Sequence, residues 1–416
     1  MRARATSVLS VSFVLFVGAA LPAAETEPTL TLERVLADVR TSHPQLRAAG
    51  ALTAAAHERV AQTGAWEDPV AGLELQRMNG NCRPFSYDAA ELQLSQKIPL
   101  SGNRERRRAL ARAEADVAAA GVRSQEFMLV AAARDAFFQL LRSREQLALT
   151  RETDRLLGHT ADLVRSRLAT GNADTAALVA AETERARLQE RVLMLDREAA
   201  DAAATLNSLR NLPPQSPVGA LAPPALTVPF ASVEEAQAHA LSHRPELREA
   251  DARITAAGRA IDLADRAWRP DPEVMLKARH FDGTGKIVND YDTAVAISLP
   301  WANDAKYRSA QREAARRREA AELDAAALRT RTAAEVRDMW QRLDTARRSA
   351  DLYRDRLLPL VRSSADNARA GLLTGKTSVA DLIAAQRALV DLQATLAANL
   401  ADSHRYAAML ATLAGN

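Results

Sequence analysis

The chain has 416 residues, of which 47% are hydrophobic and 26% are charged, and its formal net charge is +3 at pH 7. So balanced a charge does not indicate a polyanionic partner such as nucleic acid. The single cysteine, Cys82, excludes an intramolecular disulfide, and it lies too far from the N-terminus to be a lipoprotein acylation site.

Residues 1–24 have the composition of a secretory signal peptide. Arg2 and Arg4 precede an apolar run from Val8 to Ala20, and Ala23 is a plausible cleavage residue. The run is shorter than the roughly 18 to 20 residues that a membrane-spanning helix needs. Removal of the signal takes away two arginines and leaves a formal charge of +1. We therefore expect a mature protein outside the cytoplasm, which also argues against nucleic acid as a partner.

The segment from Leu32 to about Gly64 is expected to form two helices. The first is short and amphipathic, and Pro44 suits the first turn of the second. After Trp66 the pattern changes to a period of two, which predicts strands at about 70–78 and 90–98, each with one apolar and one polar face.

A long helix is expected from Asn103 to about Leu168, because no proline interrupts this segment and apolar residues recur every three or four positions. At 1.5 Å per residue it would reach roughly 100 Å. The glycine turn around Gly171 predicts a reversal into a return helix from Ala173 to Leu209. The result is an antiparallel helical hairpin over about 103–209.

Nearly the whole chain is duplicated. Pro44 and Pro245, Trp66 and Trp268, and Gly171 and Gly375 are separated by 201 to 204 residues. We therefore expect a first repeat at 25–210, a proline-rich surface linker at 211–230 and a second repeat at 231–416. The second repeat would hold strands at about 273–281 and 292–299 and a helical hairpin at about 304–413, whose first helix runs without a break to about 367.

Four strands of this length suit an outer membrane, where strands of about 9 to 11 residues cross the hydrocarbon. Four strands cannot close a barrel, and open strand edges are not tolerated in lipid. Membrane insertion therefore requires several chains to pool their strands. No later segment holds 18 consecutive apolar residues.

The order of these elements, used twice, resembles the TolC-type outer membrane factors over essentially the whole mature chain. Local sequence motifs are also similar, including His43-Pro44-Gln45-Leu46, Ile98-Pro99-Leu100 and Gly375 followed by Asp381-Leu382. These local motifs most resemble those of the heavy-metal, CzcC-like branch of the family. The fold class implied is mainly α with a small β part.

The resemblance implies a homotrimer with a 12-stranded barrel in the outer membrane and a long α-helical conduit in the periplasm. Its partners would be outer membrane lipid, a periplasmic adaptor (membrane fusion) protein and an inner-membrane pump of the resistance-nodulation-division type. The protein would be a passive exit duct for substrates that include heavy-metal cations. It would be no enzyme and would need no cofactor.

Two groups of site residues follow from the resemblance. Asp381 matches one of two inward-facing aspartates that narrow the periplasmic entrance, while Ala384 stands at the second position. A ring of three Asp381 carboxylates would favour cations; the alternative is a solvated acid near a helix N-terminus. The adaptor would contact the turns of the two hairpins, at Thr170, Gly171, Asn172, Thr374, Gly375 and Lys376.

The histidines and Cys82 show no spacing typical of a metal site, and no catalytic motif is complete. Two other functions stay open. One is a duct for a type I protein secretion system. The other is a periplasmic coiled-coil scaffold, which the lipid-length strands disfavour.

Overall fold

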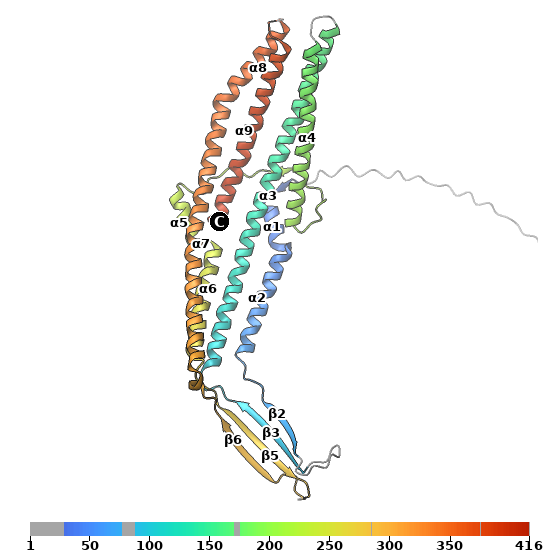
Figure 1. Cartoon of the computed structure of the whole chain (residues 1–416). Coiled ribbons are helices and arrows are strands. Elements are labelled where there is room, and N and C mark those ends of the chain that lie inside the picture. The colour runs from blue at the N-terminus through green and yellow to red at the C-terminus, as the bar shows by residue number, and fades with distance from the viewer. Residues whose placement is uncertain (1–28, 77–87, 170–174, 284, 375, 416) are drawn as a thin grey trace, which may run out of the picture.

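The computed structural model describes residues 29–76, 88–169, 175–283, 285–374 and 376–415. The molecule is elongated, with a small sheet at one end and long helices over the rest of its length (Figure 1). The signal peptide expected at residues 1–24 and Cys82 lie outside the described residues. Among the helices of the described residues, none combines the length and apolarity that a membrane crossing demands.

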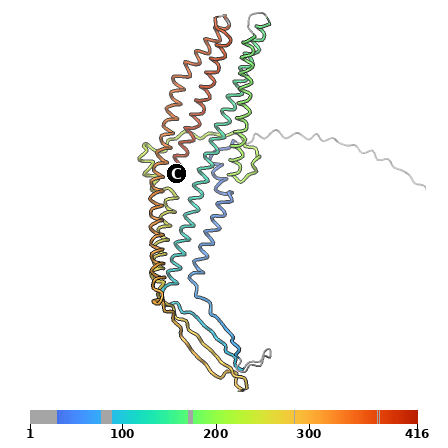
Figure 2. The backbone as a smooth tube through the Cα atoms, in the orientation of Figure 1, coloured from blue at the N-terminus to red at the C-terminus, as the bar shows by residue number. Residues whose placement is uncertain are grey.

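Apart from the two-residue strand β1 (Leu30–Thr31), the first half of the chain forms two short helices, two longer strands and a helical hairpin. These are α1 (Leu32–Ser42), α2 (Pro44–Thr63), β2 (Val70–Gln76), β3 (Ala89–Lys97), α3 (Asn103–Ala169) and α4 (Thr175–Leu209). The second half repeats the order with α5 (Val233–His243), α6 (Pro245–Ala264), β5 (Glu273–Phe281), β6 (Asp290–Ala296), a 3-10 turn (Pro300–Asn303), α7 (Asp304–Leu352), α8 (Leu358–Leu373) and α9 (Val379–Leu413). The two halves run side by side and both reach each end of the molecule (Figure 2). The mainly helical fold class is therefore confirmed.

The four strands form one antiparallel sheet in the order β2-β3-β5-β6. The two hairpins meet at β3 and β5, with Leu94 opposite Leu276. Among the described residues, β2 and β6 each have a neighbour on one side only, so both outer edges of the sheet are open there.

The second long helix is interrupted, contrary to the expectation of an unbroken helix to about 367. A π-helical turn at Tyr353–Leu357 separates α7 from α8. Pro359 lies in the first turn of α8. Proline has no N–H to donate to the preceding turn and its ring clashes there, which explains a local change of helical pitch. Pro359 is the local sequence signal for this interruption.

The proline-rich segment is mostly exposed, and it also contacts both halves of the chain. Its strand β4 (Leu221–Ala222) pairs in parallel with β1 (Leu30–Thr31). Arg144 of α3 donates to the carbonyls of Val218 and Gly219, both at 2.6 Å. Phe230 at the end of the segment is buried in the core of the second half.

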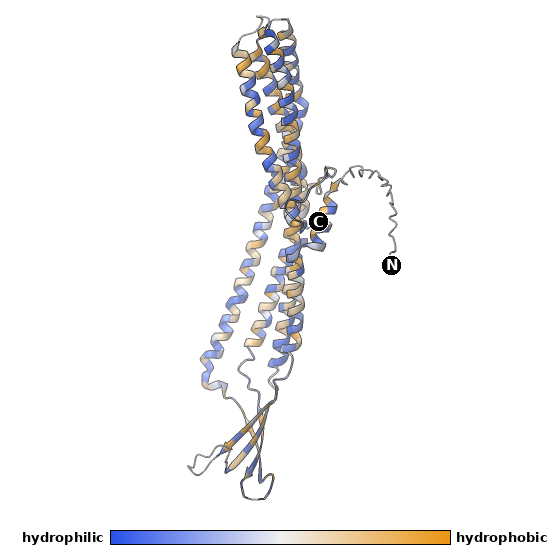
Figure 3. Ribbon diagram, turned by 90° about the vertical axis from the view of Figure 1, so that its right-hand side faces the viewer, coloured by the Kyte–Doolittle hydropathy of each residue, from blue (hydrophilic) through white to orange (hydrophobic). Residues whose placement is uncertain are grey.

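The buried apolar residues form three separate clusters along the length of the molecule. One surrounds Phe137 of α3, the second surrounds Leu410 of α9, and the third lies near the hairpin turns around Leu382. Polar and apolar residues alternate along the helices (Figure 3). The long helices α3 and α9 therefore bury a narrow stripe rather than a broad face, and α2 has no fully buried residue.

Candidate functional site

The sheet has one exposed apolar face. The strand register places Leu73 beside Leu92, and Leu94 beside Leu276. Leu73 is 67% exposed and Leu92 56% exposed. A contiguous apolar surface of this kind is typical of contact with lipid or protein.

The opposite face of the sheet is polar and carries an ion-pair network. Glu91 is only 5% exposed, yet its carboxylate accepts from Lys277 and from Arg279, each at 2.7 Å. Arg279 also pairs with Asp292 at 2.6 Å. These pairs satisfy a carboxylate that would otherwise be buried without a counter-charge. The alternation of faces expected from the sequence is thus present in the strands.

The turn that follows α8 is compact. Thr374 donates through its hydroxyl to the carbonyl of Gly371 at 3.1 Å, and the backbone N–H of Lys376 donates to the same carbonyl at 2.8 Å. Thr374 and Lys376 are both exposed. The other expected adaptor-contact residues, Thr170, Gly171, Asn172 and Gly375, lie outside the described residues.

Asp381 is exposed and lies in the first turn of α9. Its carboxylate accepts from the hydroxyl of Ser378 at 2.6 Å and from the backbone N–H of Ser378 at 3.2 Å, while its own N–H donates to the Ser378 hydroxyl at 3.1 Å. This reciprocal arrangement is a capping box. The hydrogen bonds from Ser378 hold the pKa of Asp381 below its usual value, the hydroxyl contributing most.

Two residues of this region were missed by the sequence analysis. Ser378 caps α9, and the Ser-x-x-Asp spacing is a readable signal for it. Gly371 is in close contact with the next turn, because a Cβ added to it would lie 3.0 Å from Cβ of Thr377. Nothing in the local sequence indicates the contact between Gly371 and Thr377.

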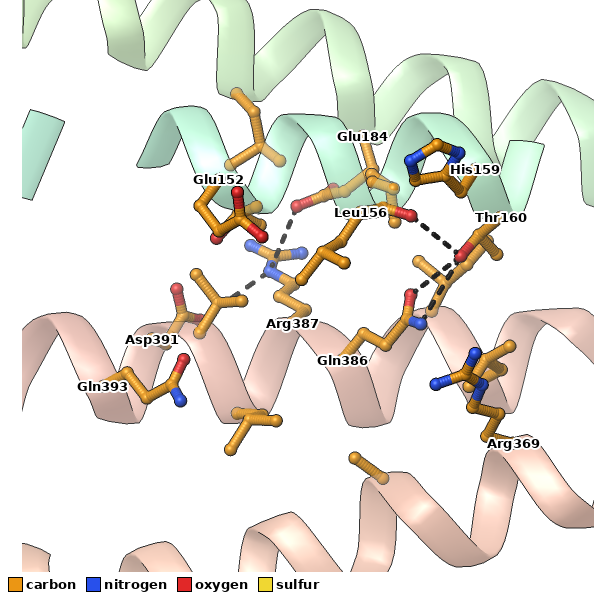
Figure 4. Close-up of a pocket in the computed structure, with 18 of the residues that line it drawn as sticks. Glu152, Leu156, His159, Thr160, Glu184, Arg369, Gln386, Arg387, Asp391 and Gln393 are labelled. Carbon is orange, nitrogen blue, oxygen red and sulfur yellow. Dashed lines mark hydrogen bonds and ion pairs between the residues drawn. The ribbon is translucent and has the colours of Figure 1, made fainter. Parts of the chain in front are cut away.

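A cavity of about 530 Å³ separates the hairpin α3–α4 from α8 and α9 near the turns (Figure 4). Two polar contacts cross between the hairpins beside it. Gln386 of α9 donates to the hydroxyl of Thr160 at 3.4 Å. Arg387 lies 3.6 Å from the carboxylate of Glu184 on α4. Among the described residues, the polar contacts between the two hairpins are therefore few and long here, while the apolar cluster around Leu382 packs Val164 of α3 against α9.

No group of three or more His, Cys, Asp or Glu residues in the described part of the chain is arranged to hold an ion.

The chain is similar in fold to several solved structures of outer-membrane channels. The chain is similar to the outer-membrane channel OprN, with 18% identity, a TM-score of 0.80 and coverage of 92% of this chain and 89% of that one. It is similar to the outer membrane protein VceC of Vibrio cholerae, with 16% identity, a TM-score of 0.78 and coverage of 92% and 96%. The outer membrane channel CmeC of Campylobacter jejuni has 14% identity, a TM-score of 0.72 and coverage of 98% and 94%.

A family model described as outer membrane efflux protein matches residues 35–211 and 237–416. The chain belongs to the outer membrane efflux protein family, whose members are channels rather than enzymes. A search of curated proteins found no match.

Proposed function

We propose that this protein is the outer membrane exit duct of a tripartite efflux system. In this proposal three chains assemble, and their sheets join through β2 and β6 into a 12-stranded barrel. The repeats at 25–210 and 231–416 would each supply one strand hairpin and one helical hairpin, with residues 211–230 between them.

The observation that carries the proposal is the four-stranded sheet with one exposed apolar face and two open edges. In lipid, unpaired backbone groups at a sheet edge cost several kcal/mol each, so only a closed barrel is stable there. Lateral joining of copies removes both edges at once. The helices then extend the barrel as a conduit.

The far end of the conduit would be the periplasmic entrance. We propose that the turns at Thr170, Gly171 and Asn172 and at Thr374, Gly375 and Lys376 contact a periplasmic adaptor, and that a resistance-nodulation-division pump delivers the substrate. Three Asp381 carboxylates would form a ring at the entrance. The contacts of Gln386 and Arg387 beside the cavity would break when the hairpins separate.

Heavy-metal cations are the cargo that we propose, on the resemblance to the CzcC-like branch and on the negative charge of Asp381. They would pass through the duct without a resident binding site.

The test is single-channel conductance of the purified, detergent-extracted protein in planar bilayers, with the oligomeric mass measured on the same sample. We expect a trimer that gives discrete cation-selective pores. A soluble monomer without conductance would contradict the proposal and favour the scaffold. A conducting trimer that co-purifies with a polypeptide exporter would instead favour the secretion duct.

A further inference from the structure

A hollow of about 400 Å³ lies where the helices meet the sheet. It is lined from α3 by Glu105, Arg106 and Ala109, from the preceding turn by Ser101 and Gly102, and from α6 and the turn after it by Arg259, Asp262 and Arg266. β3 ends only four residues before Ser101, and β5 begins seven residues after Arg266. The hollow is thus immediately next to the strands.

The charge of the hollow is unevenly neutralised. Arg259 pairs with Asp262 at 3.1 Å. Glu105 pairs with Arg104, which lies outside the lining, at 2.7 Å. Both carboxylates of the lining are therefore already engaged.

Two guanidinium groups remain. Arg106 donates to the backbone carbonyl of Asp262 at 3.2 Å and forms no ion pair within the described residues. Arg266 likewise has no carboxylate within ion-pair distance in that part of the chain. Both side chains are half-buried, so they are held against the protein rather than extended into water. Guanidinium groups in this setting match the geometry of a phosphate.

The position suits a membrane headgroup. Trp268, two residues after Arg266, is 47% exposed, and Arg269 lies over its ring. Exposed tryptophans are enriched at the level of lipid headgroups. Since the apolar face of the sheet marks the hydrocarbon layer in the proposed function, the hollow lies at the adjoining headgroup layer.

A comparison of the two repeats indicates that the arginines of the hollow have a specific role. Gly64 precedes Trp66 as Arg266 precedes Trp268, so the first half has no arginine at the corresponding place. At the start of α7, Arg308 pairs with Asp304 at 2.7 Å. The pair of arginines at the hollow therefore has no counterpart at the position of Gly64, and the duplication alone does not account for it.

We propose that Arg106 and Arg266 bind the phosphate of an anionic phospholipid at the membrane surface. This inference rests on the proposed function, because it requires the sheet to lie in the membrane. The bound phosphate would bridge α3 of the first half and α6 of the second, and would fix the sheet at its depth.

Native mass spectrometry of the detergent-solubilised oligomer with added phosphatidylglycerol tests the proposal. We expect retained lipid on the wild type, and at least about tenfold weaker binding by Arg106→Gln/Arg266→Gln, since each arginine near the surface contributes about 1 kcal/mol. The matched control is Arg191→Gln/Arg347→Gln, which removes two exposed arginines far from the sheet. It should bind as the wild type does.

Four results would decide the matter. Equal lipid retention by the wild type and the Arg106/Arg266 variant overturns the inference. Displacement of the lipid by millimolar inorganic phosphate assigns the site to free phosphate and also overturns it. If the Arg106/Arg266 variant loses lipid binding but keeps the conductance of the wild type, the inference is supported. If the wild-type oligomer conducts but never binds the lipid, the inference is refuted and the proposed duct still stands.

Discussion

Asp135 of α3 and Arg405 of α9 form an ion pair of 2.6 Å that joins the two halves of the chain. Both side chains are about one-quarter exposed, at 27% and 26%. Arg142 and Asp402 form a second such pair at 3.2 Å with the charges exchanged between the helices. The duplicated halves are therefore connected by complementary charges as well as by apolar contacts.

Removing one member of this pair should destabilise the fold. We expect Arg405→Gln to cost about 1 to 2 kcal/mol, because Asp135 keeps its charge in a partly buried place. Asp135→Asn/Arg405→Gln should recover part of the loss. Melting temperatures at a fixed scan rate measure the effect. Arg316→Gln is the control, since the pair of Arg316 with Glu319 is 81% and 54% exposed and such pairs contribute little. Equal shifts for Arg405→Gln and Arg316→Gln would contradict the prediction.

Asp381 has two separable roles, in the helix cap and in the proposed ring. Asp381→Ala removes both, whereas Ser378→Ala removes the cap and keeps the carboxylate. Each should speed amide hydrogen exchange at the start of α9, because the capping hydrogen bonds are lost. Only Asp381→Ala should reduce cation selectivity in bilayers. The same loss of selectivity in Ser378→Ala would mean that the cap, and not the charge, controls the pore.

The pH dependence of the cap follows from the lowered pKa of Asp381. A carboxylate with a depressed pKa in the folded state stabilises fully above its ordinary value of 3.8, and the contribution is lost as the pH falls through the folded pKa. Hydrogen exchange at the start of α9 should therefore be independent of this group at neutral pH.

Gly371 should be intolerant of a side chain. In Gly371→Ala the new Cβ would overlap Oγ1 of Thr377 and lie 3.0 Å from its Cβ. We expect a loss of about 1 to 3 kcal/mol at the turn, and Gly371→Ala/Thr377→Gly should relieve the overlap. Gly50→Ala in α2 is the control, because nothing lies within 4 Å of the added Cβ. That variant should be stabilised by about 0.5 to 1 kcal/mol. Melting temperatures that move together would disprove the clash.

Burial lowers the pKa of His404, although its hydrogen bond to the Pro224 carbonyl opposes the shift. The folded protein therefore holds the imidazole neutral where the unfolded chain would already bind a proton. Stability should fall as the pH drops below the ordinary value of 6.5. We expect the melting temperature of the wild type to decrease more between pH 7.5 and 5.5 than that of His404→Gln. His57→Gln, at an exposed position of α2, should follow the wild type; identical pH profiles for all three proteins would refute the role of His404.

The fold was largely readable because its signals are local and repeated. The alternation of Glu91 and Leu92 determines the two faces of β3, and the three- and four-residue spacing around Phe137 identifies α3. The pairing of Leu30 with Leu221 was not readable, since no local pattern connects residues so far apart. The interruption before Pro359 was readable and was missed.

The contacts of the candidate site also fall into two groups: some follow from a local sequence pattern, and others depend on how the helices pack. The Ser378 cap has a local spacing, whereas the proximity of Arg106 to Arg266 depends on how α3 packs against α6. Gly371 faces Thr377 only because the turn is folded as it is. Contacts of this kind belong to packing, which the hydrophobic period alone does not determine.

The two faces of the sheet give a direct test of membrane insertion. Leu94 and Gln93 are neighbours in β3 that face opposite sides, Leu94 beside Leu276 and Gln93 beside Lys277. Leu94→Glu would place a charge against hydrocarbon, at a cost of up to about 2 kcal/mol. Gln93→Glu would place the same charge beside a lysine on the polar face. We expect Leu94→Glu to lower the trimeric fraction recovered from outer membranes, and Gln93→Glu to leave it unchanged. If both variants assemble equally well, the apolar face does not contact lipid, and the strands would have to be assigned to contacts between proteins.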